Sequence, residues 1–490
     1  MGILSILLSA PVFGILVLAL TPHGKINQLR FIANLFTSIA LFLSCWLFVI
    51  YNQNDGAMQF NEQFLLNPKL GTTFALGIDG LSLPMVFLAT LLTSVALLAS
   101  FNISTHVKSY HISILLLEFG MLGVFLAQDW SLFYVFWELT LSPLFLLIAR
   151  WGGVRRHIAS LNFVLYTMGG SIFMLISLFA ISQYMPEHSG TLMSSMSVAA
   201  QSMPKDEQLW VLLGFLIGFG VKMPIFPVHG WLPLAHVEAP SPISILLSGI
   251  LLKMGAYGLI RVIVMLPEAT QMMQTILVAL ALVGMIYGGL LAWRQTDLKS
   301  MVAYSSVSHM GVVLLDIATL NKTGMMGAIL QMTAHGLVAG AMFLLVGLLY
   351  ERTHTRNILD YSSLVQVMPR FALFMTITLF AAMGLPGSVS FVAELHAVVG
   401  GFQQWGNLMI LLGLSILIGS AYAMRTIGML FTGPVKQQMR EIEDLRLLEL
   451  VAAGVLVVAI LLFGLWPAPL IELSTATMNQ MNDIISQRIQ

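Results

Sequence analysis

Four charged side chains interrupt long apolar runs of this sequence. Their surroundings are FYVFWELTLSPLF for Glu138, FGVKMPIF for Lys222, SGILLKMGAYG for Lys253 and SVSFVAELHAVV for Glu394. A charge at the centre of a bilayer costs roughly 2.5–3.5 kcal/mol on insertion scales, and ionisable residues within membrane helices are usually functional. Burial and neighbouring charges decide whether lysine and glutamate hold a proton. These residues therefore predict a path for protons.

Each of these residues also has a purely structural interpretation. Glu138 and Glu394 could be neutral carboxyl groups that are hydrogen-bonded to a neighbouring helix. Lys222 could form a fixed ion pair with Glu138, and Lys253 could extend to the membrane interface. Lys253 lies about ten residues from either end of its apolar run, which disfavours the last alternative.

Two histidines and two further carboxyl groups extend the predicted path. His309 in YSSVSHMG and His335 in QMTAHGL lie in adjacent apolar runs, and histidine exchanges protons near neutral pH. A single histidine on an apolar helix is often only a buried hydrogen-bond donor, so that interpretation remains open for both. Glu118 and Asp316 lie in or near apolar runs and are additional candidates, although each could reach an interface.

No metal or cofactor site is expected on this chain. His229, His236 and Glu238 have a spacing that resembles metal ligands, but they lie in a proline-rich segment and lack a third convincing donor. Cys45 is the only cysteine, which excludes an intramolecular disulfide and a thiolate cluster. The sequence contains no nucleotide-binding loop, dinucleotide fingerprint or zinc-protease motif, and no basic run that would bind nucleic acid.

The composition places these residues in a membrane protein with many spans. Hydrophobic residues make up 58% of the 490 residues, charged residues only 9%, and the mean hydropathy is +0.89. A span needs about 20 mostly apolar residues. We predict an all-α polytopic membrane protein with about 14 transmembrane helices. Their approximate ranges are 2–20, 28–51, 81–101, 111–127, 130–149, 160–184, 208–228, 243–265, 273–293, 300–318, 324–350, 371–400, 406–431 and 446–466.

The basic residues support this count and give an orientation. With these spans, 14 of the 22 lysines and arginines fall in the loops of one side, five fall on the other side, and three lie within spans. Basic residues prefer the cytoplasmic side of a membrane. The distribution therefore predicts that both termini lie on the outer side.

Two spans contain residues that break helices. Pro224 and Pro227 interrupt span seven, and Gly384 to Ser388 interrupts span twelve. Paired broken helices are typical of transporters built from inverted repeats. We predict N-terminal helices 1–3 in residues 1–110, a first five-helix repeat in 111–265, a second in 266–431, and helix 14 with a tail in 432–490. Carbonyl groups freed by Pro224 and Pro227 are candidates to coordinate the Lys222 ammonium or to hold water beside it.

Several motifs resemble the antiporter-like subunits of respiratory and photosynthetic complex I, in particular subunit M, also called chain 4. The motifs are WEL at 137–139, GVKMPIFPVHGWLPLAH at 220–236, EAPSPISILLSGILLKMGAYGLIR at 238–261, AYSSVSHMG at 303–311, AHG at 334–336, YERTHTR at 350–356 and GLPGSVSFVAE at 384–394. The resemblance extends over nearly the whole chain. It departs from the usual WLPDAH at Leu234, which replaces an aspartate.

The resemblance implies a fold and a role for each residue. The fold has fourteen helices in two inverted five-helix repeats. Glu138 is the ion-pair glutamate, Lys222 its partner, Lys253 the central lysine and Glu394 the outlet residue, whereas the related subunits L and N have lysine at the outlet. The relay histidines correspond to His309 and His335. The implied function is proton translocation driven by quinone reduction in other subunits.

The resemblance also implies partners and a location. NAD(P)H or ferredoxin, iron–sulfur clusters and quinone or plastoquinone would belong to other subunits, and the membrane partners would be subunits like L (chain 5) and N (chain 2). The motifs look cyanobacterial, which suggests a thylakoid membrane, with a bacterial inner membrane as the alternative. They also suggest the CO2-uptake form of the complex, in which a partner hydrates CO2. The alternative function is a subunit of an Mrp-type cation/proton antiporter.

Overall fold

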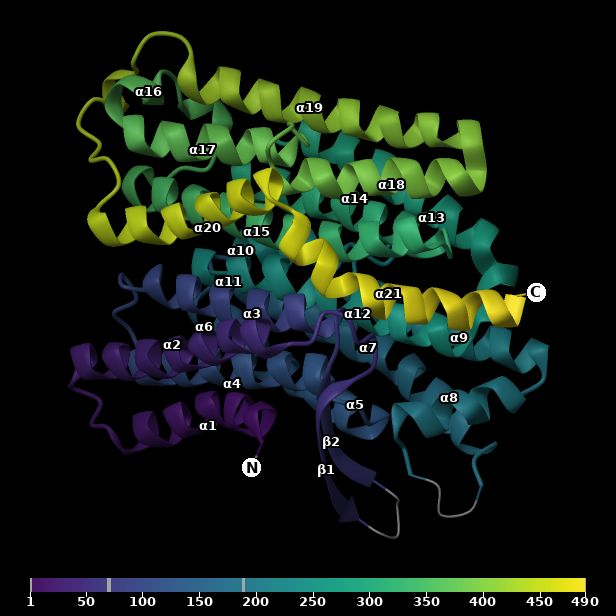
Figure 1. Ribbon diagram of the computed structural model, residues 1–490. Coiled ribbons are helices and arrows are strands. Elements are labelled where there is room, and N and C mark those ends of the chain that lie inside the picture. Colours follow the sequence, from purple (N-terminus) through teal and green to yellow (C-terminus); the bar gives the residue numbers. More distant parts are fainter. Residues whose placement is uncertain (1, 68–71, 187–189, 490) are drawn as a thin grey trace.

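Long apolar helices lie side by side along one common direction in the computed structural model of the protein (Figure 1). The structure describes residues 2–67, 72–186 and 190–489. Helices from the first part of the chain form one end of the array, and α17, α18 and α19 form the other (Figure 1). The arrangement is that of a membrane bundle, in which each helix satisfies its own backbone hydrogen bonds.

The elements that matter for the site begin after a short N-terminal part. That part consists of α1 (Ile3–Leu20), α2 (Ile26–Ile50), β1 (Gln59–Asn67), β2 (Thr72–Ile78) and α3 (Ser82–Leu98). The following helices are α4 (Val107–Leu126), α5 (Trp130–Leu139), α6 (Leu141–Trp151), α7 (Arg156–Ser182), α8 (Met193–Ser202), α9 (Lys205–Lys222), α10 (Trp231–Glu238), α11 (Ser241–Leu246) and α12 (Leu252–Met265). The last group is α13 (Pro267–Arg294), α14 (Leu298–Ala318), α15 (Lys322–Thr353), α16 (Leu364–Val367), α17 (Pro369–Ala382), α18 (Val389–Trp405), α19 (Ile410–Phe431), α20 (Leu447–Leu465) and α21 (Ala468–Ile489).

Eleven helical segments of the described residues are long and apolar enough to cross a membrane. The sequence predicted about fourteen spans. The number is lower here because a count by helix length and hydropathy merges some predicted spans and omits others. The segment Val389–Phe431 is counted once, although a turn at Gly406 separates α18 from α19. The count also omits α9 and the apolar helix α3, which has only 17 residues; α17, with 14 residues, belongs with α18 to one predicted span, 371–400. A polytopic helical membrane protein is therefore confirmed at the level of the fold class.

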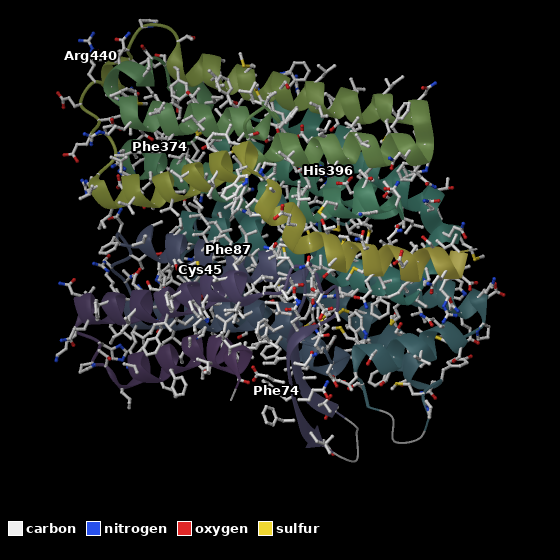
Figure 2. All side chains as sticks on the ribbon, viewed as in Figure 1. Cys45, Phe74, Phe87, Phe374, His396 and Arg440 are labelled. Atoms are coloured by element: carbon white, nitrogen blue, oxygen red, sulfur yellow. The ribbon has the colours of Figure 1, made fainter. Side chains whose placement is uncertain are left out.

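Burial divides the helices into an inner and an outer set. The segment from α11 to α12 and the helix α15 each contain an apolar stretch of 18 residues that is buried throughout. On α2 and α7, by contrast, Phe31, Phe42 and Phe179 are exposed. Side chains such as Cys45 and Phe374 lie along the helices, whereas Arg440 lies in the loop between α19 and α20 at one end (Figure 2). Exposed apolar side chains along helices of this length are suited to contact with lipid.

A two-stranded sheet corrects the prediction of an all-α chain. β1 and β2 pair antiparallel, with Phe64 opposite Phe74. They lie in the segment between the second and third predicted spans, where residues 72–78 read TTFALGI, rich in the β-branched and aromatic residues that favour strands. The hairpin projects from the helices (Figure 1), so the membrane bundle itself remains helical.

The C-terminal tail forms a helix that the sequence analysis did not predict. α21 has 22 residues, and its buried face includes Leu473, Ser474 and Thr477. Its polar composition gives no apolar window, so a search for spans passes over it. It continues from α20 along the second half of the bundle (Figure 1).

Both predicted helix breaks are present. α9 ends at Lys222, and turns lead to α10 at Trp231. α17 ends at Ala382, and α18 begins at Val389. Gly384 and Gly387 between them have φ values of +70° and +95°, a conformation that favours glycine.

Candidate functional site

Lys222 ends α9 and points at the junction between α5 and α6. Its side chain is buried, and Nζ donates to Oγ1 of Thr140 at 2.9 Å and to the carbonyl oxygen of Trp137 at 3.5 Å. Nζ also lies 3.9 Å from the centre of the Trp137 ring, where the π electrons attract a cation. Lys222 is therefore held by one carbonyl, one hydroxyl and one aromatic face.

Glu138 directly follows Trp137 on α5 but forms no ion pair with Lys222. The two charges interact through space, yet the ion pairs of the described residues do not include them. Oε1 of Glu138 is buried and has no hydrogen-bond partner in the described parts of the chain, and the carboxylate shares a hydrogen bond with Tyr134. The direct contact that the resemblance implied is replaced by a longer-range interaction.

The partners predicted for Lys222 at the proline break are wrong. The carbonyl oxygen of Val221 accepts instead from Nε1 of Trp231 on α10, at 2.8 Å. The Trp231 indole thus satisfies a carbonyl group that the helix break leaves without a backbone partner. Lys222 instead donates to residues at the junction of α5 and α6. Thr140 was missed because its proximity depends on how α9 packs against α5, which sequence spacing does not reveal.

Lys253 lies at the start of α12, directly after a turn of π-helix at Leu247–Leu251. It is fully buried. Its Nζ lies 2.6 Å from the carbonyl oxygen of Ser248 and 2.6 Å from Nδ1 of His335 on α15. Turns of π-helix within α-helices are frequent at functional sites. With the ammonium as donor, Nδ1 of His335 must be without a proton.

His335 leads on to His309. The two rings have their centres 5.5 Å apart. Nδ1 of His309 is 3.2 Å from Nε2 of Gln331, and Nε2 of His335 and Oε1 of Gln331 have no partner among the described residues. Buried polar atoms without partners usually bind ordered water. The structure thus brings together Lys253 and the two histidines that the sequence singled out.

His236 is a further buried group that sequence reasoning placed in an unlikely metal site. Both ring nitrogens lack a partner among the described residues, and the ring stacks on Phe343 at 4.4 Å. It interacts electrostatically with Lys253 and His335. Glu238 instead binds Arg155, at 3.3 Å. The signal that could have found His236 is its place between Lys222 and Lys253 in the sequence.

Glu394 lies at the second helix break. It is 8% exposed, and its carboxylate contacts the backbone at Gly384, where a Cβ atom would collide with Oε2. Tyr422 on α19 interacts electrostatically with Glu394 and shares a hydrogen bond with Ser305 on α14. No hydrogen bond among the described residues joins Glu394 to His309, so a link between them requires water.

The two additional candidates stand apart from these groups. Glu118 on α4 and Asp316 on α14 are fully buried, and neither carboxylate has a partner among the described residues. Within the described part of the chain, no other charged group acts on either of them. Leu234, where the family motif has aspartate, is half-buried on α10 and packs against the apolar core.

A hollow of about 300 Å³ opens where α6, α10 and α15 end and α14 begins. Glu238, Lys299, Glu351 and Arg356 line it. Lys299 is buried and donates to the carbonyl oxygen of Ala239 at 2.7 Å. It also interacts electrostatically with His236. The hollow therefore adjoins charged groups that lie close to the buried histidine.

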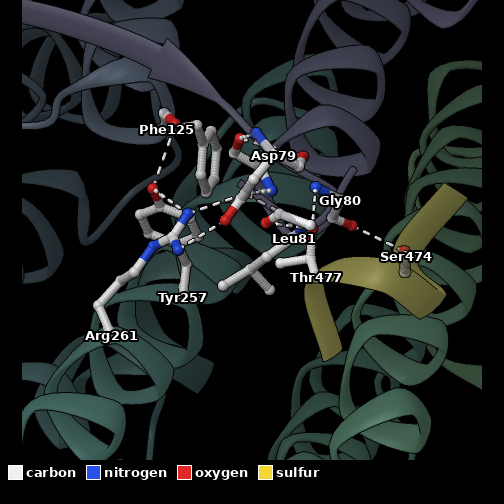
Figure 3. A network of polar contacts seen from close by, with 10 residues as sticks. Asp79, Gly80, Leu81, Phe125, Tyr257, Arg261, Ser474 and Thr477 are labelled. Carbon is white, nitrogen blue, oxygen red and sulfur yellow. Dashed lines mark hydrogen bonds and ion pairs between the residues drawn. The ribbon is translucent and has the colours of Figure 1, made fainter. Parts of the chain in front are cut away.

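A polar network fixes the far end of α12. Arg261 donates to both carboxylate oxygens of Asp79, at 2.7 and 2.9 Å, and to the hydroxyl of Tyr257 at 3.2 Å. Gly80 accepts from Ser474 and donates to Thr477, which ties α21 to the same place (Figure 3). The network joins the segment before α3, α12 and the C-terminal helix.

The ion pair determines the charge state of Asp79. Burial alone would raise the pKa of this carboxyl group, but the charge of Arg261 and hydrogen bonds from Arg261 and Ser82 outweigh it. They hold the pKa below its ordinary value of 3.8.

Comparisons with known proteins agree with this arrangement. Residues 127–419 match the family described as "NADH:quinone oxidoreductase/Mrp antiporter, TM". The chain is 38% identical over 497 residues to NAD(P)H-quinone oxidoreductase chain 4 1 of Picosynechococcus sp., covering 98% of this chain and 91% of the relative. It is 41% identical over 456 residues to the protein of the same name from Synechococcus elongatus, with 90% and 83% covered.

A solved structure matches over the full length. It is a chain of respiratory complex I from Thermus thermophilus with bound NADH, with a TM-score of 0.90 and 29% identity over 98% of this chain and 99% of that one. A chain of the Mrp complex from Dietzia sp. has a TM-score of 0.84 at 21% identity, covering 99% of this chain and 55% of that one. The second match shows a shared fold.

Proposed function

Because this chain belongs to the NADH:quinone oxidoreductase/Mrp antiporter transmembrane family, we propose that it is a proton-translocating membrane-arm subunit of an NAD(P)H- or ferredoxin-quinone oxidoreductase. The contact between Lys253 and His335 carries the proposal. A buried ammonium bonded to a histidine nitrogen can pass a proton without leaving the membrane interior.

The proposed path has three parts. Glu138 and Lys222 form the first, and movement of the carboxylate toward the lysine would favour the protonated lysine. Lys253, His335 and His309 form the central part. Glu394 at the second helix break forms the outlet. Water between the three parts would complete the hydrogen bonds of buried atoms that lack partners, such as Nε2 of His335.

His236 and the hollow at Lys299 supply an entry from the inner side. The hollow lies at helix ends that the basic residues assign to that side. From it, Lys299 and His236 lead toward Lys253, on which His236 acts electrostatically. Phe343 fixes the plane of the His236 ring by stacking. Protons from the inner side can thus reach Lys253 without passing through Glu138 and Lys222.

We further propose fourteen crossings and two inverted repeats, 111–265 and 266–431. The fourteen treat α18 and α19 as separate crossings and include α3 and α9. The breaks after Lys222 and before Val389 occupy the fourth crossing of each repeat. A helix break leaves backbone groups available for ions or water at the middle of the membrane.

Electron transfer belongs to other subunits in this proposal. The electron donor, the iron–sulfur clusters and the quinone would bind there, since Cys45 alone cannot ligate a cluster. The partners would be the antiporter-like subunits L and N. The membrane would be a cyanobacterial thylakoid, because the relatives with chain 4 names include cyanobacterial proteins. The CO2-uptake form rests on the wording of the motifs and predicts a co-purifying subunit that hydrates CO2.

Purification and a proton assay test the proposal together. The tagged chain should co-purify with quinone-reductase subunits, and Lys253→Met in the assembled complex should lower the number of protons moved per quinone reduced. A chain that exchanges Na⁺ for H⁺ without those subunits would instead identify an Mrp-type antiporter. An unchanged proton ratio in an assembled Lys253→Met complex would refute the role of this residue.

A further inference from the structure

Asp316 is a buried carboxyl group that the proposed path does not use. It is fully buried on α14, and both carboxylate oxygens lack a hydrogen-bond partner among the described residues. A polar group buried in this way costs free energy unless it binds water or a proton. Across the interface lies Gly327 of α15, where a Cβ atom would come within 3.1 Å of the carboxylate. Space beside the acid therefore depends on the absence of a side chain.

Asp316 shares a helix face with His309. The two residues are seven positions apart, which is about two helical turns, or roughly 10 Å along the axis. On the facing helix α15, Gln331 contacts His309 at 3.2 Å, and Gly327 lies about one turn further along. Oε1 of Gln331 has no partner among the described residues. Unpaired acceptors thus mark both ends of one strip of the α14–α15 interface.

The strip ends at a polar hollow. Thr319 lies three residues after Asp316, and its hydroxyl donates to the Asp316 carbonyl oxygen at 2.7 Å. Thr319 also lines a hollow of about 310 Å³ together with Gln271, Gln274, Gln404 and Ser486. Gln274 donates to the carbonyl oxygen of Ala318 at 2.8 Å. The distribution of basic residues assigns this end of α14 to the outer side.

We propose that Asp316 is a proton carrier of a second exit, which runs from His309 and Gln331 along the α14–α15 interface to the hollow at Thr319. Water bound between Gln331 and Asp316 delivers a proton to the carboxylate, and the neutral acid releases it to water in the hollow. Each transfer breaks one O–H bond as it forms another, and release of the proton to the hollow regenerates the carboxylate. The inference rests on the proposed function, because it needs protons at His309. The second exit would operate in parallel with the exit through Glu394.

A purely structural role makes a different prediction. A carboxyl group that stays neutral and only fills space is replaced by the isosteric Asp316→Asn without any change in proton movement. A proton carrier is not replaced by asparagine, whereas Asp316→Glu keeps the titratable group. Proton movement, rather than assembly, therefore separates the two roles.

The test measures protons moved per quinone reduced by the whole complex in sealed vesicles. Asp316→Asn should give a ratio between those of the native and Lys253→Met complexes. The double variant Asp316→Asn with Glu394→Gln should fall to the Lys253→Met ratio. Glu268→Gln is the matched control, because this carboxylate lies on the outer side, is 34% exposed and pairs with Lys205. Its ratio should remain native.

Gly327→Ala provides a second variant that leaves Asp316 in place. Its methyl group would occupy the space beside the carboxylate, so its ratio should also fall, even if Asp316→Asn fails to assemble. A native ratio for either assembled single variant would overturn the second exit. If Lys253→Met lowers the ratio in the same experiment, only this inference fails. If Lys253→Met also has a native ratio, the proposed function fails with it.

Discussion

The ammonium nitrogen of Lys253 lies 2.6 Å from Nδ1 of His335, and both side chains are buried between α12 and α15. The π turn before Lys253 also places the carbonyl oxygen of Ser248 within 2.6 Å of the same nitrogen. Two acceptors thus hold one ammonium group at the centre of the bundle. The contact joins the two halves of the chain.

Replacement of His335 by leucine should slow proton movement. The variant removes the acceptor of Lys253 and the link to His309, and groups that transfer protons commonly contribute about 10²–10⁴-fold to a rate. We expect a loss of at least roughly 10²-fold in the proton-transfer rate of this subunit. The rate is measured as proton uptake by vesicles that contain the assembled complex.

His396→Leu is the control for that experiment. His396 is half-buried on α18 and contacts the carbonyl oxygen of Val392 in its own helix. Its loss should leave the rate native. Equal proton-transfer rates for His335→Leu and His396→Leu would contradict the role of His335 in the path.

Replacement of Thr140 by valine tests the place where Lys222 is held. Valine has a similar shape but cannot accept the hydrogen bond from Nζ. A buried donor that loses its partner costs about 1–3 kcal/mol, so the rate should fall roughly tenfold or more. Thr140→Ser keeps the hydroxyl group and should restore most of the rate. Equal rates for Thr140→Val and Thr140→Ser would contradict a role for the hydrogen bond between Lys222 and Thr140.

Gly255→Ala tests the contact between α9 and α12. A Cβ atom at Gly255 would lie 2.7 Å from the carbonyl oxygen of Phe219 and 2.9 Å from the amide nitrogen of Met223. The helices must then separate next to Lys222. Overpacking typically costs about 1–3 kcal/mol. We expect a lower melting temperature and a lower proton ratio.

Gly413→Ala adds the same methyl group where no atom of the described residues lies within 4 Å, apart from the backbone of its own helix and its two chain neighbours. It should change neither the melting temperature nor the proton ratio. Equal melting temperatures for the two alanine variants would show that the close approach at Gly255 is not required.

Loss of the Asp79 carboxylate should destabilise the bundle. Arg261 would remain buried without its partner, and such a change typically costs about 3–5 kcal/mol. Asp79→Ala should therefore unfold at a lower denaturant concentration than the native chain. Asp55→Ala is a suitable comparison, because Asp55 is exposed and its carboxylate accepts a bond only from the nearby Ala57 amide among the described residues.

The same ion pair gives a pH dependence. The pKa of Asp79 in the folded chain lies below its ordinary value of 3.8. The stabilisation is therefore fully present above that ordinary value and is lost as the pH falls through the folded pKa. Below pH 3.8 the native chain should lose stability more steeply than Asp79→Ala. Parallel stability curves for both proteins would contradict this.

The sequence predicted the elements that follow from local composition. Apolar runs gave the helices, and prolines and glycines gave the breaks after Lys222 and before Val389. Charged and histidine residues in those runs gave His335 as a candidate, which contacts Lys253. These features can be read from the sequence because a charged or helix-breaking residue within an apolar run is unfavourable there whatever it packs against.

Features that depend on packing were not predicted. Thr140 contacts Lys222 because α9 meets the junction of α5 and α6, and Trp231 occupies the carbonyl group expected to bind the lysine. The buried side of α21 consists partly of serine and threonine, which a search for apolar spans misses. Pairing between distant segments cannot be read from spacing in one sequence.

The central claim is that Lys253 carries protons through this subunit. The most direct test compares Lys253→Met with Lys253→Arg in the assembled complex, with protons moved per quinone reduced as the measurement. Methionine cannot carry a proton, and arginine holds its proton too firmly to release it. The account predicts that both variants reduce quinone but move fewer protons per quinone than the native complex. A native ratio in either assembled variant would contradict it.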